Sequence, residues 1–136
     1  MVVVHVVAAI LVRDQRIFIA QRPADDALEF KWEFPGGKIE AGESPEASLR
    51  REMIEEFQMD IAVGDFFGES LYTYPKGTVR LLAYWATWIQ GEPQLLAHAD
   101  CRWVTVDELN QYEFAPADIP FVERLKESGS LPRSQQ

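Results

Sequence analysis

The chain has 136 residues, about the size of one domain, and its 13 Lys and Arg against 22 Asp and Glu give a formal net charge of −9. This acidic balance argues against a groove for a nucleic-acid polymer, because neutralising the phosphates along a strand requires a basic surface. A hydrophobic fraction of 47% allows a packed core and excludes disorder over most of the length. Cys101 is the single cysteine, so no disulfide can form within the chain.

The sequence opens with two predicted strands. Residues 2–12 form the longest apolar run, which His5 interrupts, and its valines and isoleucine favour a buried strand. The run is too short to span a bilayer and lacks the basic start and cleavage site of a secretory signal. Residues 16–21 follow a turn at Asp14 and Gln15, so the two strands should pair as a hairpin. We therefore expect a cytoplasmic, monomeric domain that does not engage a membrane.

An irregular polar segment, residues 22–31, precedes a short extended piece at 32–34. Pro35, Gly36 and Gly37 then stop it. Such a break lets the backbone approach another group closely or turn sharply.

A helix is predicted to start at Ser44 and Pro45, since serine can cap free backbone N–H groups and proline at the first position loses no hydrogen bond. It should extend to about Gln58. Four apolar side chains share the stripe that a core-facing helix needs. They are Leu49, Met53, Ile54 and Phe57.

The second half predicts strands between residues 60 and 90, with a turn at 75–77. Thr105 and Glu108 form a capping box for a short helix, and a last helix runs from Asp118 to about Lys126. Residues 129–136 are expected to be a flexible tail, which leaves a single domain over 1–128. This order of elements predicts an α+β fold with a mixed sheet between helices.

Three carboxylates gather on the first helix. Glu52, Glu55 and Glu56 are three and four residues apart, so they face one side, roughly opposite the apolar stripe. A solvated acidic face is the simplest interpretation. Glu43 at the helix entry and Arg51, four residues before Glu55 and able to orient it, favour a divalent cation site instead.

The spacing of these residues resembles the signature box of the Nudix hydrolase family. That box reads Gly, five residues, Glu, seven residues, Arg-Glu, an aliphatic, any residue, Glu-Glu, any residue, Gly, an aliphatic. The matching positions here are Gly37, Glu43, Arg51, Glu52, Met53, Glu55, Glu56 and Met59. Gln58 departs from the pattern, where glycine would end the helix in a left-handed turn, and this departure costs local strain more than chemistry.

The resemblance extends beyond the box. Residues 21–23 and 32–38 are similar to the MutT branch, whose members remove pyrophosphate from nucleoside triphosphates, and residues 115–120 to the subgroup called CTP pyrophosphohydrolases. It implies a Nudix α/β/α sandwich.

The resemblance also implies a catalytic centre with Mg²⁺ or Mn²⁺. The metal ligands would be Gly36 (through its carbonyl), Glu52, Glu55 and Glu56. The catalytic residues would be Arg51 with Glu52 or Glu55 as the general base, and the sequence leaves the choice of base open.

The resemblance implies a substrate site as well. Arg22 and Lys38 would bind phosphate or base, and Glu33 and Phe34 would line the base pocket, although solvated charges and a core ring are the simpler interpretations. Asp118 stands where MutT-like members have an asparagine that contacts the base. An ionised aspartate only accepts hydrogen bonds, which favours an amino group such as cytosine N4 or adenine N6; a protonated or water-bridged one would blur that preference. A plain helix N-cap is the alternative for this residue.

Relatives often carry one more metal-binding glutamate shortly before a His and a Trp. Ala97 aligns with it, so the extra carboxylate is either absent or replaced by Asp100. His98 is expected to be a structural hydrogen-bonding residue, and Cys101 a small buried apolar one.

We therefore expect hydrolysis of a nucleoside triphosphate to the monophosphate and pyrophosphate, with cytosine or oxidised nucleotides such as CTP, 5-methyl-dCTP or 8-oxo-dGTP as substrates, in nucleotide-pool sanitation. One alternative is a Nudix hydrolase of ADP-ribose or dinucleoside polyphosphates. The other is a non-catalytic nucleotide sensor, which the intact Arg-Glu-x-x-Glu-Glu core argues against because a sensor needs no general base.

Overall fold

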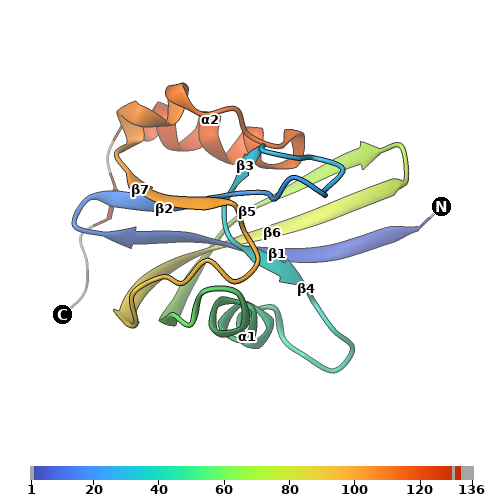
Figure 1. Cartoon of the computed structure of the whole chain (residues 1–136), viewed down its shortest axis with the longest axis horizontal. Coiled ribbons are helices and arrows are strands. Elements are labelled where there is room, and N and C mark those ends of the chain that lie inside the picture. Colours follow the sequence, from blue (N-terminus) through green and yellow to red (C-terminus); the bar gives the residue numbers. More distant parts are fainter. Residues whose placement is uncertain (1, 130, 133–136) are drawn as a thin grey trace.

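A seven-stranded mixed sheet lies between two helices in the computed structural model, which describes residues 2–129, 131 and 132 (Figure 1). The strands are β1 (Val3–Arg13), β2 (Arg16–Gln21), β3 (Trp32–Glu33), β4 (Gly36–Lys38), β5 (Asp60–Tyr74), β6 (Gly77–Gln90) and β7 (Asp100–Val104). The helices are α1 (Pro45–Phe57), α2 (Ile119–Ser128) and the short 3₁₀ turns η1 (Val106–Gln111) and η2 (Pro116–Asp118). The predicted α+β sandwich is confirmed.

The centre of the sheet is the parallel pair of β1 and β6, in the strand order β3-β2-β1-β6-β5, with β4 paired to β1 and β7 to β2. The predicted β1–β2 hairpin is confirmed. Its two turn residues, Asp14 and Gln15, have φ values of 53° and 62°, the left-handed conformation that a two-residue hairpin turn of matching twist requires.

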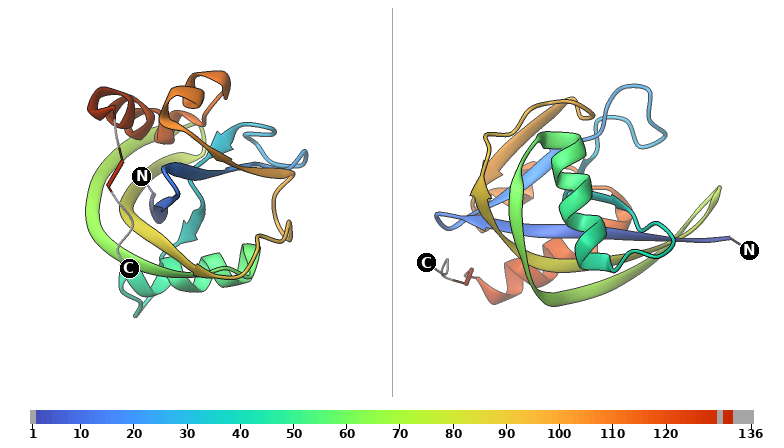
Figure 2. Two further views of the ribbon diagram at one scale, coloured as in Figure 1. Left: turned by 90° about the vertical axis from the view of Figure 1, so that its left-hand side faces the viewer. Right: turned by 90° about the horizontal axis from the view of Figure 1, so that it is seen from below.

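The two helices lie on opposite faces of the sheet (Figure 2), and each face buries a separate apolar layer under its helix. Alternate residues of β1 serve the two layers: Val7 and Leu11 lie on the α1 side, while Ala8 and Ile10 lie on the α2 side. A strand covered on both faces needs no polar alternation. This explains the continuous apolar run at the start of the sequence.

The first helix begins and ends as its sequence predicts. The Ser44 hydroxyl accepts a hydrogen bond from the Ala47 amide at 3.1 Å, and Gln58 ends the helix with φ 56° and ψ 37°. Ile54 is a wrong prediction for the apolar stripe, because its side chain is 54% exposed. It follows Met53 directly, so it lies about 100° further round the helix and faces solvent.

Two strands differ from the prediction. Residues 36–38, expected as a break, form β4 and pair antiparallel with β1. The close approach expected there is present, since a Cβ on Gly36 would lie 1.8 Å from the Val7 carbonyl oxygen. Strand β7, which pairs with β2, was not predicted. The short helix after Thr105 is confirmed in position, although it is a 3₁₀ turn, and the Glu108 carboxylate accepts from the Thr105 amide at 2.8 Å.

The chain closes with α2, which begins directly after Asp118 and ends at Gly129 with a φ of 72°. Leu131 is buried in the layer under α2, whereas residues 130 and 133–136 of the predicted tail lie outside the described residues. Among the described helices, none is both long and apolar enough to cross a membrane.

Candidate active site

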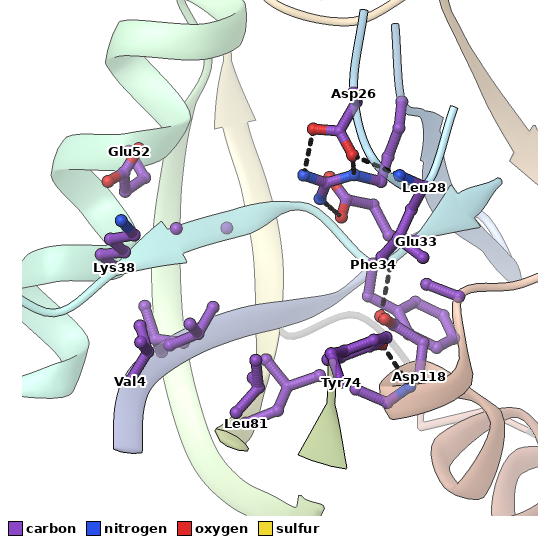
Figure 3. A pocket seen from close by; sticks show the side chains of 18 of the residues that line it. Val4, Asp26, Leu28, Glu33, Phe34, Lys38, Glu52, Tyr74, Leu81 and Asp118 are labelled. Atoms are coloured by element: carbon purple, nitrogen blue, oxygen red, sulfur yellow. Dashed lines mark hydrogen bonds and ion pairs between the residues drawn. The ribbon is translucent and has the colours of Figure 1, made fainter. Parts of the chain in front are cut away.

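A cavity of about 740 Å³ lies where β1, β3, β4, α1, η2 and the β5–β6 turn meet (Figure 3). It brings together most of the residues that the sequence analysis selected for chemistry. They are Arg22, Glu33, Phe34, Gly36, Lys38, Glu52, Glu56 and Asp118. Arg51 and Glu55 do not line this cavity.

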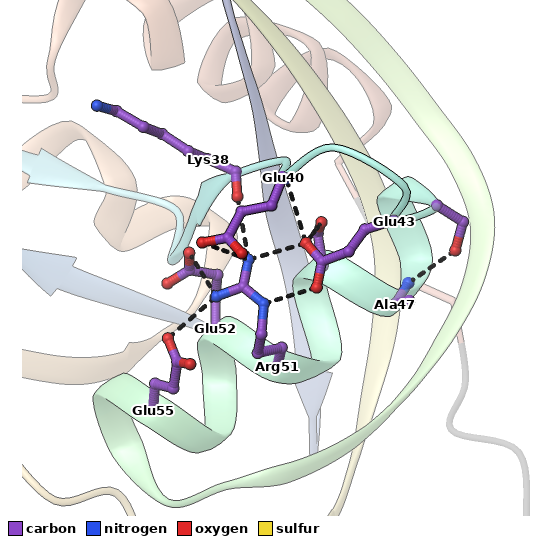
Figure 4. Close-up of polar contacts among 9 residues, drawn as sticks. Lys38, Glu40, Glu43, Ala47, Arg51, Glu52 and Glu55 are labelled. Atoms are coloured by element: carbon purple, nitrogen blue, oxygen red, sulfur yellow. Dashed lines mark hydrogen bonds and ion pairs between the residues drawn. The ribbon is translucent and has the colours of Figure 1, made fainter.

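Arg51 organises the carboxylates on the α1 side of the cavity (Figure 4). Its Nε and Nη2 donate to the two oxygens of Glu43 at 2.7 and 3.0 Å. Its Nη1 donates to both Glu52 Oε2 at 3.2 Å and Glu55 Oε1 at 3.0 Å. The Lys38 carbonyl accepts from Nη2 at 3.2 Å. One guanidinium therefore joins the loop before α1, two turns of the helix and the end of β4, and it orients Glu55 as predicted.

Glu43 is held by several hydrogen bonds in this network. Hydrogen bonds from Arg51 and then from Ser48 lower the pKa of Glu43 to about 2, so it is ionised at neutral pH. Its oxygens also accept from the Ser48 hydroxyl and from the Glu40 amide. The loop from residue 40 to the start of α1 is thereby held to the helix.

Glu52 lies against the backbone of β4. A Cβ on Gly37 would come within 2.2 Å of the Glu52 carboxyl carbon, so a larger residue there would displace the Glu52 carboxylate. The glycine of the signature box is therefore explained by packing against the first carboxylate of the helix.

Burial disfavours the ionised forms of Glu52 and Glu56, the two carboxylates of α1 that line the cavity. The pKa of Glu56 is raised to about 7, mainly by burial and also by the charges of Glu52 and Glu33, while His98 and Arg22 oppose the shift. Burial likewise raises the pKa of Glu52. A divalent cation would stabilise both ionised forms, so the chemistry of these donors fits a metal.

Few protein side chains would coordinate that metal ion. Within the described part of the chain, no three or more His, Cys, Asp or Glu side chains are gathered closely enough to hold an ion. Glu55 is 57% exposed and held by Arg51 instead of facing the cavity. Two carboxylates completed by waters and substrate phosphates are the coordination that Mg²⁺ commonly adopts.

Asp118 lies at the opposite end of the cavity and is 5% exposed. Its Oδ1 accepts a hydrogen bond from the Phe34 amide at 3.0 Å, and its side chain makes no cap to α2. The N-cap interpretation is therefore wrong. Burial raises the pKa of Asp118 well above its usual value, and the charge of Glu33 adds to this shift, against the Phe34 hydrogen bond and the charge of Arg22. A protonated Asp118 can donate as well as accept, as an amide does.

Arg22 is engaged by two carboxylates. It donates to both oxygens of Asp26 at 2.7 and 2.5 Å, and to Glu33 Oε1 at 2.6 Å. The other oxygen of Glu33 lies 2.8 Å from His98 Nε2. Arg22 therefore holds Glu33 and the loop 22–31 in place. This positioning role differs from the phosphate or base contact that the sequence predicts for Arg22. Asp26 was not selected from the sequence, since an aspartate beside Asp25 in a polar loop gives no signal of its own.

His98 hydrogen-bonds Glu33, as expected of a structural residue. Its side chain is 5% exposed and stacks on Phe57, with ring centroids 5.0 Å apart. Ala97 and His98 line the cavity, whereas the Asp100 carboxylate accepts from the Cys101 amide at 2.8 Å and pairs with Arg102 at 3.1 Å. Nothing in this arrangement directs Asp100 toward the carboxylates of α1. Cys101 is half-buried at the edge of the layer under α1, and burial raises the pKa of its thiol.

Comparison with known proteins places the chain in a well-populated family. Residues 3–125 match the NUDIX domain family. The chain is similar to the CTP pyrophosphohydrolase of Escherichia coli K12, with 37% identity over 123 residues that cover 90% of this chain and 91% of the relative. It is also similar to the 8-oxo-dGTP diphosphatase of the same organism, with 34% identity over 113 residues that cover 83% and 88%. Among solved structures, that of the E. coli ORF135 protein superposes with a TM-score of 0.82 at 36% identity, covering 93% of this chain and 91% of that one.

Proposed function

This chain belongs to the Nudix hydrolase family, and from that premise we propose that it hydrolyses a nucleoside triphosphate to the monophosphate and pyrophosphate. One observation carries the proposal: a single cavity, which Glu56 also lines, has Glu52 and Lys38 at one end and Phe34 with Asp118 at the other (Figure 3). The first end suits phosphates and a cation, and the second suits a base, with an aromatic ring and a hydrogen-bonding group.

Nudix hydrolases generally depend on a divalent metal ion. For this chain we propose Mg²⁺ or Mn²⁺, held by Glu52, Glu56 and the Gly36 carbonyl, with Glu55 placed beside Glu52 by their shared Arg51 Nη1 donor. When bound, such an ion polarises phosphoryl oxygens and lowers the pKa of a bound water.

Glu52 is the better candidate for the general base. It lines the cavity in which the attacking water would lie, whereas Glu55 does not. In the proposed reaction the Glu52 carboxylate accepts the proton of the attacking water, while Arg51 holds the carboxylate in place. Lys38 supplies positive charge at the phosphates.

The base end supports cytosine or oxidised nucleotides as substrates. The relatives bear the names of enzymes for CTP and for 8-oxo-dGTP. A protonated Asp118 offers the donor and acceptor of an amide, which suits an oxidised guanine, whereas an ionised one suits the amino group of cytosine. We further propose that the enzyme acts as a monomer, as a single domain over residues 1–128, in the cytoplasm.

Pyrophosphate release with Mg²⁺ tests the proposal. We would measure kcat/KM for CTP, dCTP, 5-methyl-dCTP, 8-oxo-dGTP, 2-hydroxy-dATP, dGTP and ADP-ribose. Release of pyrophosphate from a cytosine or oxidised nucleotide, well above dGTP, is the expected result. Hydrolysis of ADP-ribose alone would assign another leaving group, and a stoichiometric nucleotide complex without turnover would indicate a sensor.

A further inference from the structure

Tyr74 is a cavity residue that the sequence analysis did not select. It is the last residue of β5, directly before the turn to β6, and its half-buried side chain lines the cavity near Phe34 and Asp118 (Figure 3). Its ring packs against that of Tyr72, with centroids 4.6 Å apart. An aromatic side chain at this point would be explained by packing alone, but a hydroxyl would not.

The hydroxyl has a defined partner on the wall that carries Asp118. The Ala117 amide, one residue before Asp118, donates a hydrogen bond to the Tyr74 oxygen at 3.0 Å. This bond ties the end of β5 to η2. Among the described residues this is the hydroxyl's one hydrogen bond, and it accepts there, so the phenolic proton can be donated to a ligand.

The surroundings keep that proton on the oxygen. Burial raises the pKa of Tyr74, and the Ala117 hydrogen bond opposes this shift. Tyr74 is thus a neutral donor whose oxygen is held in place beside the carboxyl group of Asp118.

We propose that Tyr74 is a base-recognition residue, whose hydroxyl donates a hydrogen bond to an acceptor atom of the nucleotide base next to the atom that Asp118 contacts. The inference rests on the proposed function in one respect, that the occupant of the cavity is a nucleotide. Tyr74 and Asp118 together match a base edge with an acceptor beside an N–H group. Cytosine, through N3 and its amino group, and 8-oxoguanine, through O6 and N7–H, both have such an edge.

Tyr74→Phe separates this role from packing, because it removes the hydroxyl and keeps the ring. We would compare the best triphosphate of the panel with a triphosphate whose base is benzene, which makes no hydrogen bonds. The variant should lose about tenfold in kcat/KM on the former, mainly through KM, as expected for one lost hydrogen bond. On the benzene nucleotide it should equal the wild type within about twofold.

A matched control lies on the same strand. Tyr72 is 41% exposed and does not line the cavity, so Tyr72→Phe should leave both substrates unchanged. Since Tyr74→Phe removes the partner of the Ala117 amide, the chemical shift of the Phe34 amide would be recorded to show that Asp118 still binds it. An equal loss on both nucleotides, or no loss on either, would overturn the proposal.

Binding of monophosphates distinguishes this inference from the proposed function. Dissociation constants of CMP, 8-oxo-dGMP and the benzene nucleotide monophosphate do not depend on turnover. A weaker affinity of Tyr74→Phe for a natural base alone supports base recognition even if no triphosphate is hydrolysed. Equal affinities of variant and wild type for all three would contradict it.

Discussion

The two ends of the cavity use the same functional group in opposite ways. On the α1 side, Glu43, Glu52 and Glu55 share one guanidinium, and Glu55 is 57% exposed. On the η2 side, Asp118 is 5% exposed and is held by the neutral amide of Phe34. The first arrangement orients all three carboxylates and keeps Glu43 ionised, whereas the second favours the neutral form of a buried carboxyl group.

The difference shows how a chain with a net charge of −9 handles an anionic substrate. Where phosphates and a cation would bind, negative charge is gathered and balanced by Arg51, with Lys38 in the same cavity. Where a base would bind, burial makes the neutral form of Asp118 favourable. The position and burial of a carboxyl group, more than its residue type, therefore decide its role in the site.

Glu56→Gln should have the largest effect, because it removes a proposed metal ligand at the charged end. Even partners outside the coordination shell commonly cost about 10–100-fold, so we expect kcat to fall by more than about 100-fold. Mn²⁺ affinity, followed by water-proton relaxation, should fall as well. Glu123→Gln on α2, where the side chain is 62% exposed, is the matched control. A variant at position 56 with near-normal turnover would contradict the metal assignment.

Substitutions of Arg51 and Arg22 should affect different kinetic parameters, the first kcat and the second KM. Arg51→Lys keeps the charge but loses the fork that holds Glu43 and Glu52, so kcat should fall about 10–100-fold. Arg22→Lys loosens Glu33 and Asp26 near the base end, so it should act mainly by raising KM. Steady-state kinetics on the best triphosphate measure both. The same kcat and KM pattern in the two variants would argue against distinct ends.

The stability of Asp118→Asn should depend on pH. The folded pKa of Asp118 lies above the unfolded value of about 3.9, so the folded state binds the extra proton between the two. The stabilising contribution is complete below about pH 4 and is lost as pH rises through the folded pKa. The variant does not titrate, so it should gain stability relative to the wild type from pH 4 to pH 8. Urea unfolding across that range tests this, and a constant difference would contradict it.

The stability of Glu43→Gln relative to the wild type should depend on pH in the opposite direction. Arg51 lowers the pKa of Glu43 in the folded state to about 2, below its value in the unfolded chain. The extra stability of the wild type is therefore complete at pH values above the unfolded pKa. It disappears as pH falls toward 2. Thermal unfolding between pH 5 and pH 2 should therefore show the two proteins converging at the acidic end. A gap that widens with acid would contradict the network.

Gln58→Gly should have the smallest effect. Gln58 lies at the end of α1 and does not line the cavity. The substitution relieves a left-handed residue at φ 56° but adds unfolded-state entropy, so a gain of about 0.5–1 kcal/mol in unfolding free energy is expected. Urea unfolding measures this gain. The kcat on the best triphosphate should not change, and a large change would mean that α1 transmits its end geometry to Glu52.

The sequence predicts α1, its ends and the contact between Arg51 and Glu55 well because the signals are local. Ser44, Pro45 and the spacing of Arg51, Glu52 and Glu56 all lie within a few turns of one helix. In contrast, β4 was not predicted, because two glycines after a proline have no strand propensity and form a strand only by pairing with β1.

The base end was harder to predict because its contacts link distant segments. The bond between Asp118 and the Phe34 amide spans 84 residues, and that between His98 and Glu33 spans 65. At Asp118 the local signal for a helix cap was misleading, since burial under tertiary contacts decides where its carboxyl group points. Tyr74 gave only the signal of a strand aromatic.

The parallel pairing of β1 with β6 has a kinetic consequence. The β5–β6 hairpin closes over a two-residue turn, but β1 must find β6 across the whole intervening chain, from Val3 beside Thr78 to Val12 beside Thr87. Because pairing at such sequence separation is slow, we expect the part of the cavity that β1 and β6 line to form late in folding. A nucleotide that binds only the finished cavity should therefore slow unfolding while leaving the refolding rate unchanged. The bound ligand would thus lengthen the lifetime of the native state without helping the chain to reach it.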